Sequence, residues 1–248
     1  MRFRDISLKV KILLITFIGV VVIVGVFSVI FTRAIGEQAT DAIIEKSRAV
    51  VLSAEAVREN MAQKLEDGVL QDFEVLIQRG NREDLISAVP IITAIDVARE
   101  NSEEANYRFR VPKQSPRNPE NEPTELEAEV LAELKETGAS EKIIYGDNEI
   151  RYFRPIELTA ECMLCHGSPA GDPDPIGGIK EGWSVGEIHG AFEIISSLES
   201  AQLTQRAAAV NISLISAVML IALGGILWIS IRRVTKPLST YIENFDKV

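Results

Sequence analysis

Two long apolar blocks near the chain ends dominate the hydropathy pattern. Residues 12–32 and residues 207–231 each run without a charged side chain. At 1.5 Å per helical residue, both blocks reach the roughly 20 residues that cross a bilayer core about 30 Å thick. A core helix of a soluble protein keeps a polar face, so this pattern predicts two transmembrane helices.

Basic residues outside the two blocks predict the orientation. They are Arg2, Arg4, Lys9, Lys11, Arg232, Arg233 and Lys236. Because Lys- and Arg-rich flanks stay in the cytoplasm, residues 1–11 and 232–248 are expected inside, and residues 33–206 in the periplasm. A cleaved signal peptide is the alternative for the first block, with Ala34-Ile35-Gly36 as a weak cleavage site. The block is longer than the roughly 7–15 apolar residues of a signal peptide, which favours an uncleaved anchor in the inner (cytoplasmic) membrane.

Helical periodicity follows the first block. Residues 37–78 contain no proline and place apolar side chains, among them Val51 and Met61, at three- and four-residue steps, which predicts one long helix with a buried stripe. Further helices are expected at 84–88, at 90–100 and at 124–137.

Apolar and polar residues alternate in four later segments. They predict strands at 107–111, 142–145, 150–156 and 190–195, with Gly146-Asp147-Asn148 as a hairpin turn. The proline-rich residues 112–123 predict an ordered loop. The fold class is therefore α+β, an antiparallel sheet with a long N-terminal helix, flanked by two transmembrane helices.

Charge and cysteine content exclude two classes of protein. Residues 34–206 hold 17 Lys and Arg against 33 Asp and Glu, a net charge of −16 within a total of −10. Without a basic stripe, a nucleic acid is not an expected partner. Two cysteines in the whole chain exclude a disulfide-dense secreted scaffold.

The segment Cys162-Met163-Leu164-Cys165-His166 matches the C-x-x-C-H pattern of c-type haem attachment. Two thiols at this spacing reach the two vinyl groups on one edge of the porphyrin, and the following His166 is placed as the proximal ligand of the iron. A chain with only two Cys and two His rarely forms this pattern by chance, so it predicts one covalent haem c.

Three other uses of the two thiols are alternatives to haem attachment. A redox pair needs no following histidine and prefers a thioredoxin-like setting, which the pattern lacks. A zinc site would need Cys162, Cys165, His166 and either His189 or a carboxylate. A disulfide between cysteines three residues apart is strained.

The distal side of the iron leaves alternatives open. Thioether and imidazole are the usual sixth ligands of c-type haems. Met61, on the apolar stripe of the long helix, is the favoured metal ligand, with His189 or an open site as the alternatives. Trp183 either packs on the porphyrin or belongs to the core. No acid–base pair accompanies the motif, so an enzyme is not expected.

Several motifs together resemble a known family. They are Phe109-Arg110-Val111-Pro112, Pro116-Arg117-Asn118-Pro119-Glu120-Asn121, Cys162 to His166, and Gly182-Trp183-Ser184-Val185-Gly186-Glu187. Over residues 40–195 the chain resembles the PAS-like c-type haem sensor domains of methyl-accepting chemotaxis receptors and sensor kinases. This resemblance implies a PAS-like fold, one haem and a gas-sensing or redox-sensing role.

The C-terminal segment Arg232-Arg233-Val234-Thr235-Lys236-Pro237-Leu238 resembles the start of a HAMP linker. The second HAMP helix and any output domain would follow and are missing, so either the chain is truncated or the natural protein stops here.

These features predict the sensory half of a transmembrane receptor for signal transduction. We expect a homodimer that acts on cytoplasmic signalling machinery through the missing output domain, and that responds to a gas or a redox partner. The alternatives are a membrane-anchored monohaem c-type cytochrome for electron transfer, and a small-molecule receptor with a structural haem.

Overall fold

The structure is a computed structural model that describes residues 8–70, 73–80, 82–100 and 102–245. The chain divides into two units, one formed by residues 40–199 and the other by residues 1–39 together with residues 200–248.

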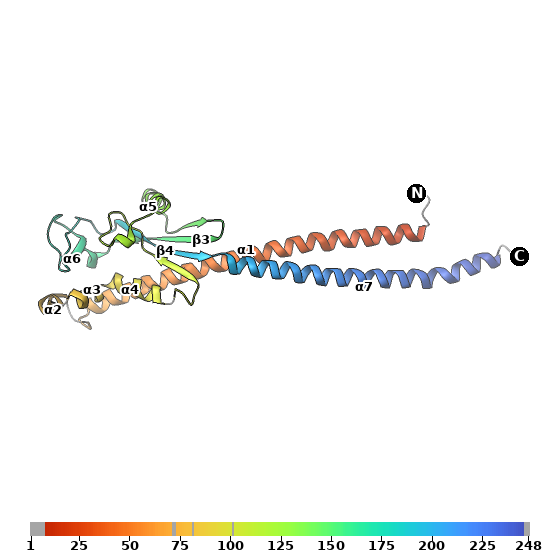
Figure 1. The fold of residues 1–248 in the computed structure, drawn as a ribbon, viewed down its shortest axis with the longest axis horizontal. Helices are drawn as coiled ribbons and strands as arrows, with labels where there is room; N and C mark the ends of the chain where they lie inside the picture. The colour runs from red at the N-terminus through yellow and green to blue at the C-terminus, as the bar shows by residue number, and fades with distance from the viewer. Residues whose placement is uncertain (1–7, 71–72, 81, 101, 246–248) are drawn as a thin grey trace. The chain divides into compact units, whose positions relative to one another are not determined.

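The unit made of the two chain ends consists of two long helices that lie side by side (Figure 1). Helix α1 spans Leu8–Glu66 and helix α7 spans Glu199–Phe245, so each contributes its apolar part to this unit. Polar contacts join them: the hydroxyl oxygens of Ser28 and Ser216 lie 3.5 Å apart, and Gln205 Nε2 donates to the Thr32 carbonyl at 3.2 Å.

Both helices are long and apolar enough to cross a membrane, judged by length and composition. Their large side chains face outward, as at Ile15 and Ile221, which are 63% and 76% exposed. That the two helices span a membrane, and that both chain ends face the cytoplasm, stay predictions. Arg2 and Arg4 lie outside the described residues, as do residues 246–248 of the predicted HAMP start.

The unit formed by residues 40–199 is built on a four-stranded antiparallel sheet in the order β1-β4-β3-β2. The strands are β1 Tyr107–Arg110, β2 Lys142–Tyr145, β3 Glu149–Glu157 and β4 Ile188–Ser197. The Gly146 N–H closes the β2–β3 hairpin by donating to the Glu149 carbonyl at 2.8 Å. The predicted strands and the α+β class are confirmed.

Short helices complete this unit. They are α2 Phe73–Arg79, α3 Arg82–Ser87, α4 Pro90–Glu100, α5 Glu125–Thr137 and α6 Met163–His166, with the 3-10 turns η2 Pro119–Asn121 and η3 Ala160–Cys162. The helices expected at 84–88, 90–100 and 124–137 correspond to α3, α4 and α5.

The single helix expected over residues 37–78 is wrong at its C-terminal end. Helix α1 stops at Glu66, and α2 starts only at Phe73. The backbone of Gly68 has a φ of +68°, which a helix cannot accommodate and which glycine adopts without steric penalty. This isolated glycine in a helical pattern therefore marks the point where the helix is interrupted.

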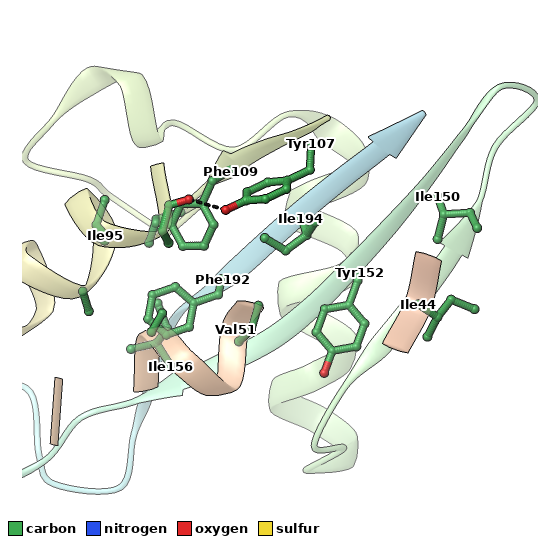
Figure 2. Packing of buried hydrophobic residues seen from close by; sticks show 14 residues of the cluster. Ile44, Val51, Ile95, Tyr107, Phe109, Ile150, Tyr152, Ile156, Phe192 and Ile194 are labelled. Carbon is green, nitrogen blue, oxygen red and sulfur yellow. Dashed lines mark hydrogen bonds between the residues drawn. The ribbon is translucent and has the colours of Figure 1, made fainter. Parts of the chain in front are cut away.

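One face of the sheet packs against α1 and α4. Phe192 and Ile194 of β4 point to this face together with Tyr152 of β3, and they meet Val51 of α1 (Figure 2). The Tyr107 hydroxyl donates to the carbonyl of Ala98 on α4 at 2.5 Å, which ties β1 to that helix. Burial of these large side chains fixes residues 40–66 of α1 on the sheet.

The opposite face of the sheet packs against α5. Leu131 and Leu134 of this helix are fully buried with Phe153 and Ala191 of the sheet. The helix begins with a capping box, in which the Thr124 hydroxyl accepts from the Glu127 N–H and the Glu127 carboxylate accepts from the Thr124 N–H. It ends at Gly138, which has left-handed dihedral angles as a C-cap.

Four charged side chains lie together under α5. Glu127 and Glu193 are fully buried, and Arg151 bonds to both, at 2.8 Å and 2.6 Å. Arg110 donates to Glu127 at 2.9 Å. Burial, followed by the neighbouring Glu127, raises the pKa of Glu193 to about 8. Burial also acts on Glu127, but hydrogen bonds from Glu193, Arg110 and the Thr124 backbone outweigh it and lower the pKa of Glu127 to about 2.

We therefore expect Glu193→Gln to remove a pH dependence of stability. Because the pKa of folded Glu193 is raised, its proton stabilises the fold fully below about pH 4.5, and this contribution is lost as the pH rises towards about 8. A glutamine amide replaces the protonated carboxyl as donor to Glu127 and does not ionise. At pH 8.5 the variant should exceed the wild type in free energy of unfolding by on the order of 2 kcal/mol.

Urea denaturation at pH 5 and pH 8.5 measures this difference. Glu149→Gln, at a partly exposed carboxylate on the neighbouring strand, is the matched control. Parallel pH profiles for the wild type and Glu193→Gln would show that Glu193 does not hold the proton.

Candidate functional site

The C-x-x-C-H segment forms a short helical stretch between strands β3 and β4. Turn η3 and helix α6 carry it, and α6 ends at Gly167, whose N–H donates to the Met163 carbonyl at 3.0 Å. Backbone hydrogen bonds between Leu158 and the residues just before β4 hold the base of this segment. Cys162 and Cys165 are free thiols three residues apart, so on a helical turn they project from one side.

An apolar pocket of about 260 Å³ opens beside these thiols. Its walls come from α3 and α4, from the sheet, and from the C-x-x-C-H helix itself, and include Ile86, Val89, Ile92, Ile95, Val111, Ile156, Leu158 and Leu164. Cys162, Cys165 and His166 line the same pocket, as does His189 of β4. Two thiols and two imidazoles against an apolar wall form a donor set suited to a flat, largely apolar macrocycle with a central metal.

The thiols differ from those of a reactive redox pair. Burial raises the pKa of Cys165, and the nearby Asp174 raises it further. An attacking thiol needs a lowered pKa, so this environment does not favour disulfide exchange.

The imidazole of His166 is held at its Nδ1 atom by the carboxylate of Glu181. Its Nδ1 lies 2.8 Å from Glu181 Oε2. Burial alone would raise the pKa of Glu181, but hydrogen bonds from Arg117 and His166 outweigh it and lower the value to about 2. An ionised carboxylate only accepts, so Nδ1 donates, and Nε2 keeps the lone pair that a metal ligand needs.

Arg117, in the proline-rich loop, organises the segment that follows the motif. Its guanidinium bonds to Glu181 and Asp174 and donates to the carbonyls of Cys165 and Ile179, each at 2.8 Å. A side chain at Gly178 would come within 2.6 Å of Asp174 and 2.8 Å of the guanidinium, so this close approach requires glycine. The proline-rich residues 112–123, predicted as an ordered loop, thus carry a structural clamp, formed by Arg117 with Asp174 and Glu181.

His189 lies next to His166 at the pocket wall. The ring centroids are 4.8 Å apart, and Lys113 Nζ lies 2.8 Å from His189 Nε2. The Nδ1 atom of His189 is buried without a hydrogen-bond partner. Burial, and then the positive charge of Lys113, lowers the pKa of His189 to about 3, so the ring is neutral at physiological pH. A neutral imidazole can bind a metal.

Neither of the two remaining predicted residues, Trp183 and Met61, is among the described residues that line the pocket. The Trp183 ring packs edge-on against His189, with centroids 5.1 Å apart, and the backbone N–H of Trp183 donates to the His166 carbonyl at 2.8 Å. Met61 is half-buried on α1 and is not one of the residues that line the pocket, whereas Arg58, one turn earlier, is. Ligation by Met61 stays a prediction that no contact in the described chain supports.

The residues that surround His166 were not predicted from the sequence. Glu181 stands just before the Gly182-Trp183 motif, and Arg117 stands inside the Pro116–Asn121 motif, but neither motif indicates a role for them beside His166. The spacing of the buried positions on α1 could have identified Arg58 as a candidate site residue. The buried positions of α1 run Ile44, Ser47, Val51, Ala54 and Arg58, which places an arginine where a heptad stripe predicts an apolar residue.

The fold and the site together define an α+β domain with a C-x-x-C-H helix at the edge of an apolar pocket. Over residues 36–197 the sequence matches the Tll0287-like family, described as Tll0287, and the chain belongs to this family.

Among solved structures, the chain is similar to the crystal structure of the cyanobacterial heme-protein Tll0287. The TM-score is 0.50 and the sequence identity 20%, over 63% of this chain and 95% of that chain. At this identity the likeness shows a shared fold. No curated protein matches the sequence.

Proposed function

We propose that residues 33–206 form a periplasmic sensor domain with one covalently bound haem c. One observation carries this proposal: the two thiols and the imidazole of the C-x-x-C-H segment line a single apolar pocket. The haem named in the description of the cyanobacterial relative supports it. When bound, the haem supplies an iron that changes oxidation state and can take up a small ligand.

The chain's own residues would each have a defined task. Cys162 and Cys165 anchor one edge of the macrocycle, and His166 offers Nε2 to the metal. Glu181 fixes the orientation of this imidazole and raises its basicity. The apolar side chains of α3, α4 and the sheet exclude water from the pocket.

The sensor would signal through α1 and α7. Residues 12–32 and 207–231 would span the inner membrane, and residues 232–248 would begin a HAMP linker towards an output domain. A homodimer would let paired helices shift against each other when the haem state changes. The apolar surface of both helices supports this arrangement.

Electron transfer is the second candidate, and the pair of imidazoles favours it. His166 and His189 both reach the pocket. An iron held by two imidazoles would exchange electrons without binding a gas. Sensor and cytochrome differ in one respect, since only a sensor must change its helix packing with the state of the haem.

Hydrogen exchange of the holoprotein distinguishes the two functions. Amide protection of residues 40–66 and 199–206 would be compared in the ferric form, the ferrous form and the ferrous form with nitric oxide. A sensor predicts that protection in α1 or α7 changes by several-fold between at least two of these states, because local opening equilibria report packing.

The double variant Cys162→Ala/Cys165→Ala is the control for this comparison and should show no such change. Identical protection in all three states of the wild type would favour the electron-transfer cytochrome. A wild type purified without haem would contradict both functions.

A further inference from the structure

Helix α1 carries a buried arginine where it passes the pocket. Arg58 is only 9% exposed, and it continues the stripe of Val51 and Ala54, which are 0% and 2% exposed. Those two residues pack on the sheet, whereas Arg58 lines the pocket. The cation is therefore aimed at the place that a bound molecule would occupy.

Arg58 lacks the partner that a buried cation needs. Within the described part of the chain, its one hydrogen bond is from Nη1 to the Glu157 carbonyl at 3.3 Å, and its Nε is buried without a partner there. Among the described residues, no carboxylate lies within ion-pair distance of it. Two other arginines, Arg48 and Arg154, are more exposed and yet bind Glu141 and Glu55. Burial of an unpaired charge is costly, so an anion is expected to complete this site.

The other cations at the pocket are already engaged. Lys113 bonds to His189, and Arg117 is held by Asp174 and Glu181. The rest of the pocket wall is mostly apolar, with Ile86, Val89 and Ile95 among its residues, and it also includes Asn118, Asn121 and Glu161. An occupant that is apolar in its body and carries an ionised carboxylate matches this combination.

We infer that Arg58 is the anchor of a haem propionate. This inference rests on the proposed function, because the haem brings both the apolar ring and the carboxylates. A guanidinium pairs with a carboxylate through two parallel hydrogen bonds, which positions it as well as neutralising it. The pairing would join the haem to α1, whose helix runs without a break from Leu8 to Glu66.

Arg58→Gln and Arg58→Lys in the holoprotein test this inference. Loss of the positive charge beside the haem stabilises the ferric form, so Arg58→Gln should shift the reduction equilibrium about tenfold towards ferric haem, which is about 59 mV for a one-electron couple. Arg58→Lys keeps the charge and should leave the midpoint potential near the wild-type value. Both variants lose the planar fork, so both should shift the propionate bending band in the resonance Raman spectrum.

Arg108→Gln is the matched control, because the Arg108 side chain is 71% exposed and the substitution removes the same charge at the surface. It should leave the band and the potential unchanged. If Arg58→Gln does not accumulate in cells, the propionate bending band of Arg58→Lys alone tests the inference, and a shift of this band would support it. Bands and potentials equal to the control would overturn the role of Arg58 while the haem stays in place. A wild-type chain without haem would instead overturn the proposed function, and this inference with it.

Discussion

Arg117→Met is expected to lower the free energy of unfolding of the holoprotein by about 3 kcal/mol, because it breaks a pair with a buried carboxylate. The Asp174 side chain is fully buried and depends on Arg117 as its cationic partner, while its Oδ1 accepts from the backbone N–H groups of Ile176 and Gly178. The substitution leaves that charge buried and also releases Glu181 and the carbonyls of Cys165 and Ile179. Urea denaturation in detergent, followed by far-UV circular dichroism, measures the loss.

Two further variants show whether loss of the Arg117–Asp174 ion pair causes the decrease in the free energy of unfolding. Arg117→Met combined with Asp174→Asn should recover part of the stability, because an asparagine keeps the Oδ1 acceptor without the unpaired charge. Arg108→Met removes an exposed ion pair with Glu149 and should cost less than about 1 kcal/mol. Equal losses for Arg117→Met and Arg108→Met would show that the clamp does not stabilise this segment.

Cys162→Ala with Cys165→Ala is expected to abolish covalent haem incorporation completely. Both thiols lie at the wall of one pocket, and they are the only cysteines in the chain. Each single variant should retain one thioether bond and therefore a haem that survives denaturation in reduced amount. Haem staining of a denaturing gel reads all four proteins side by side. Stain retained in the double variant would mean that the haem is held elsewhere.

Local signals were sufficient to predict most of the fold. Helix α4 begins at Pro90, where its fixed φ favours a first turn, and β2 covers the expected residues 142–145. Each of these elements is encoded by neighbours in the sequence. The break after Glu66 was missed because the helical pattern continues on both sides of Gly68, and the backbone conformation of one glycine decided it.

The candidate site could be predicted only for those residues that are close together in the sequence. Cys162, Cys165 and His166 are close in sequence, so their spacing alone indicated the chemistry. The supporting residues come from distant segments: Arg117 reaches Glu181 across 64 positions, and Arg58 reaches the pocket from α1. Only the tertiary fold brings such pairs together. The favoured distal ligand, Met61, was chosen by elimination among the methionines and histidines and by its place on the apolar stripe of α1, and its ligation stays a prediction. Arg58, one turn earlier on the same helix, lines the pocket.

The central claim is that one haem is bonded to this chain through both cysteines. Its most direct test is the intact mass of the denatured wild-type protein, produced in cells that attach haem c and followed by fragmentation of the peptide that contains Cys162 and Cys165. The expected mass is that of the chain plus one haem, with the added mass on this peptide and both thiols protected from alkylation. A mass equal to that of the bare chain, with both thiols open to alkylation, would contradict the claim.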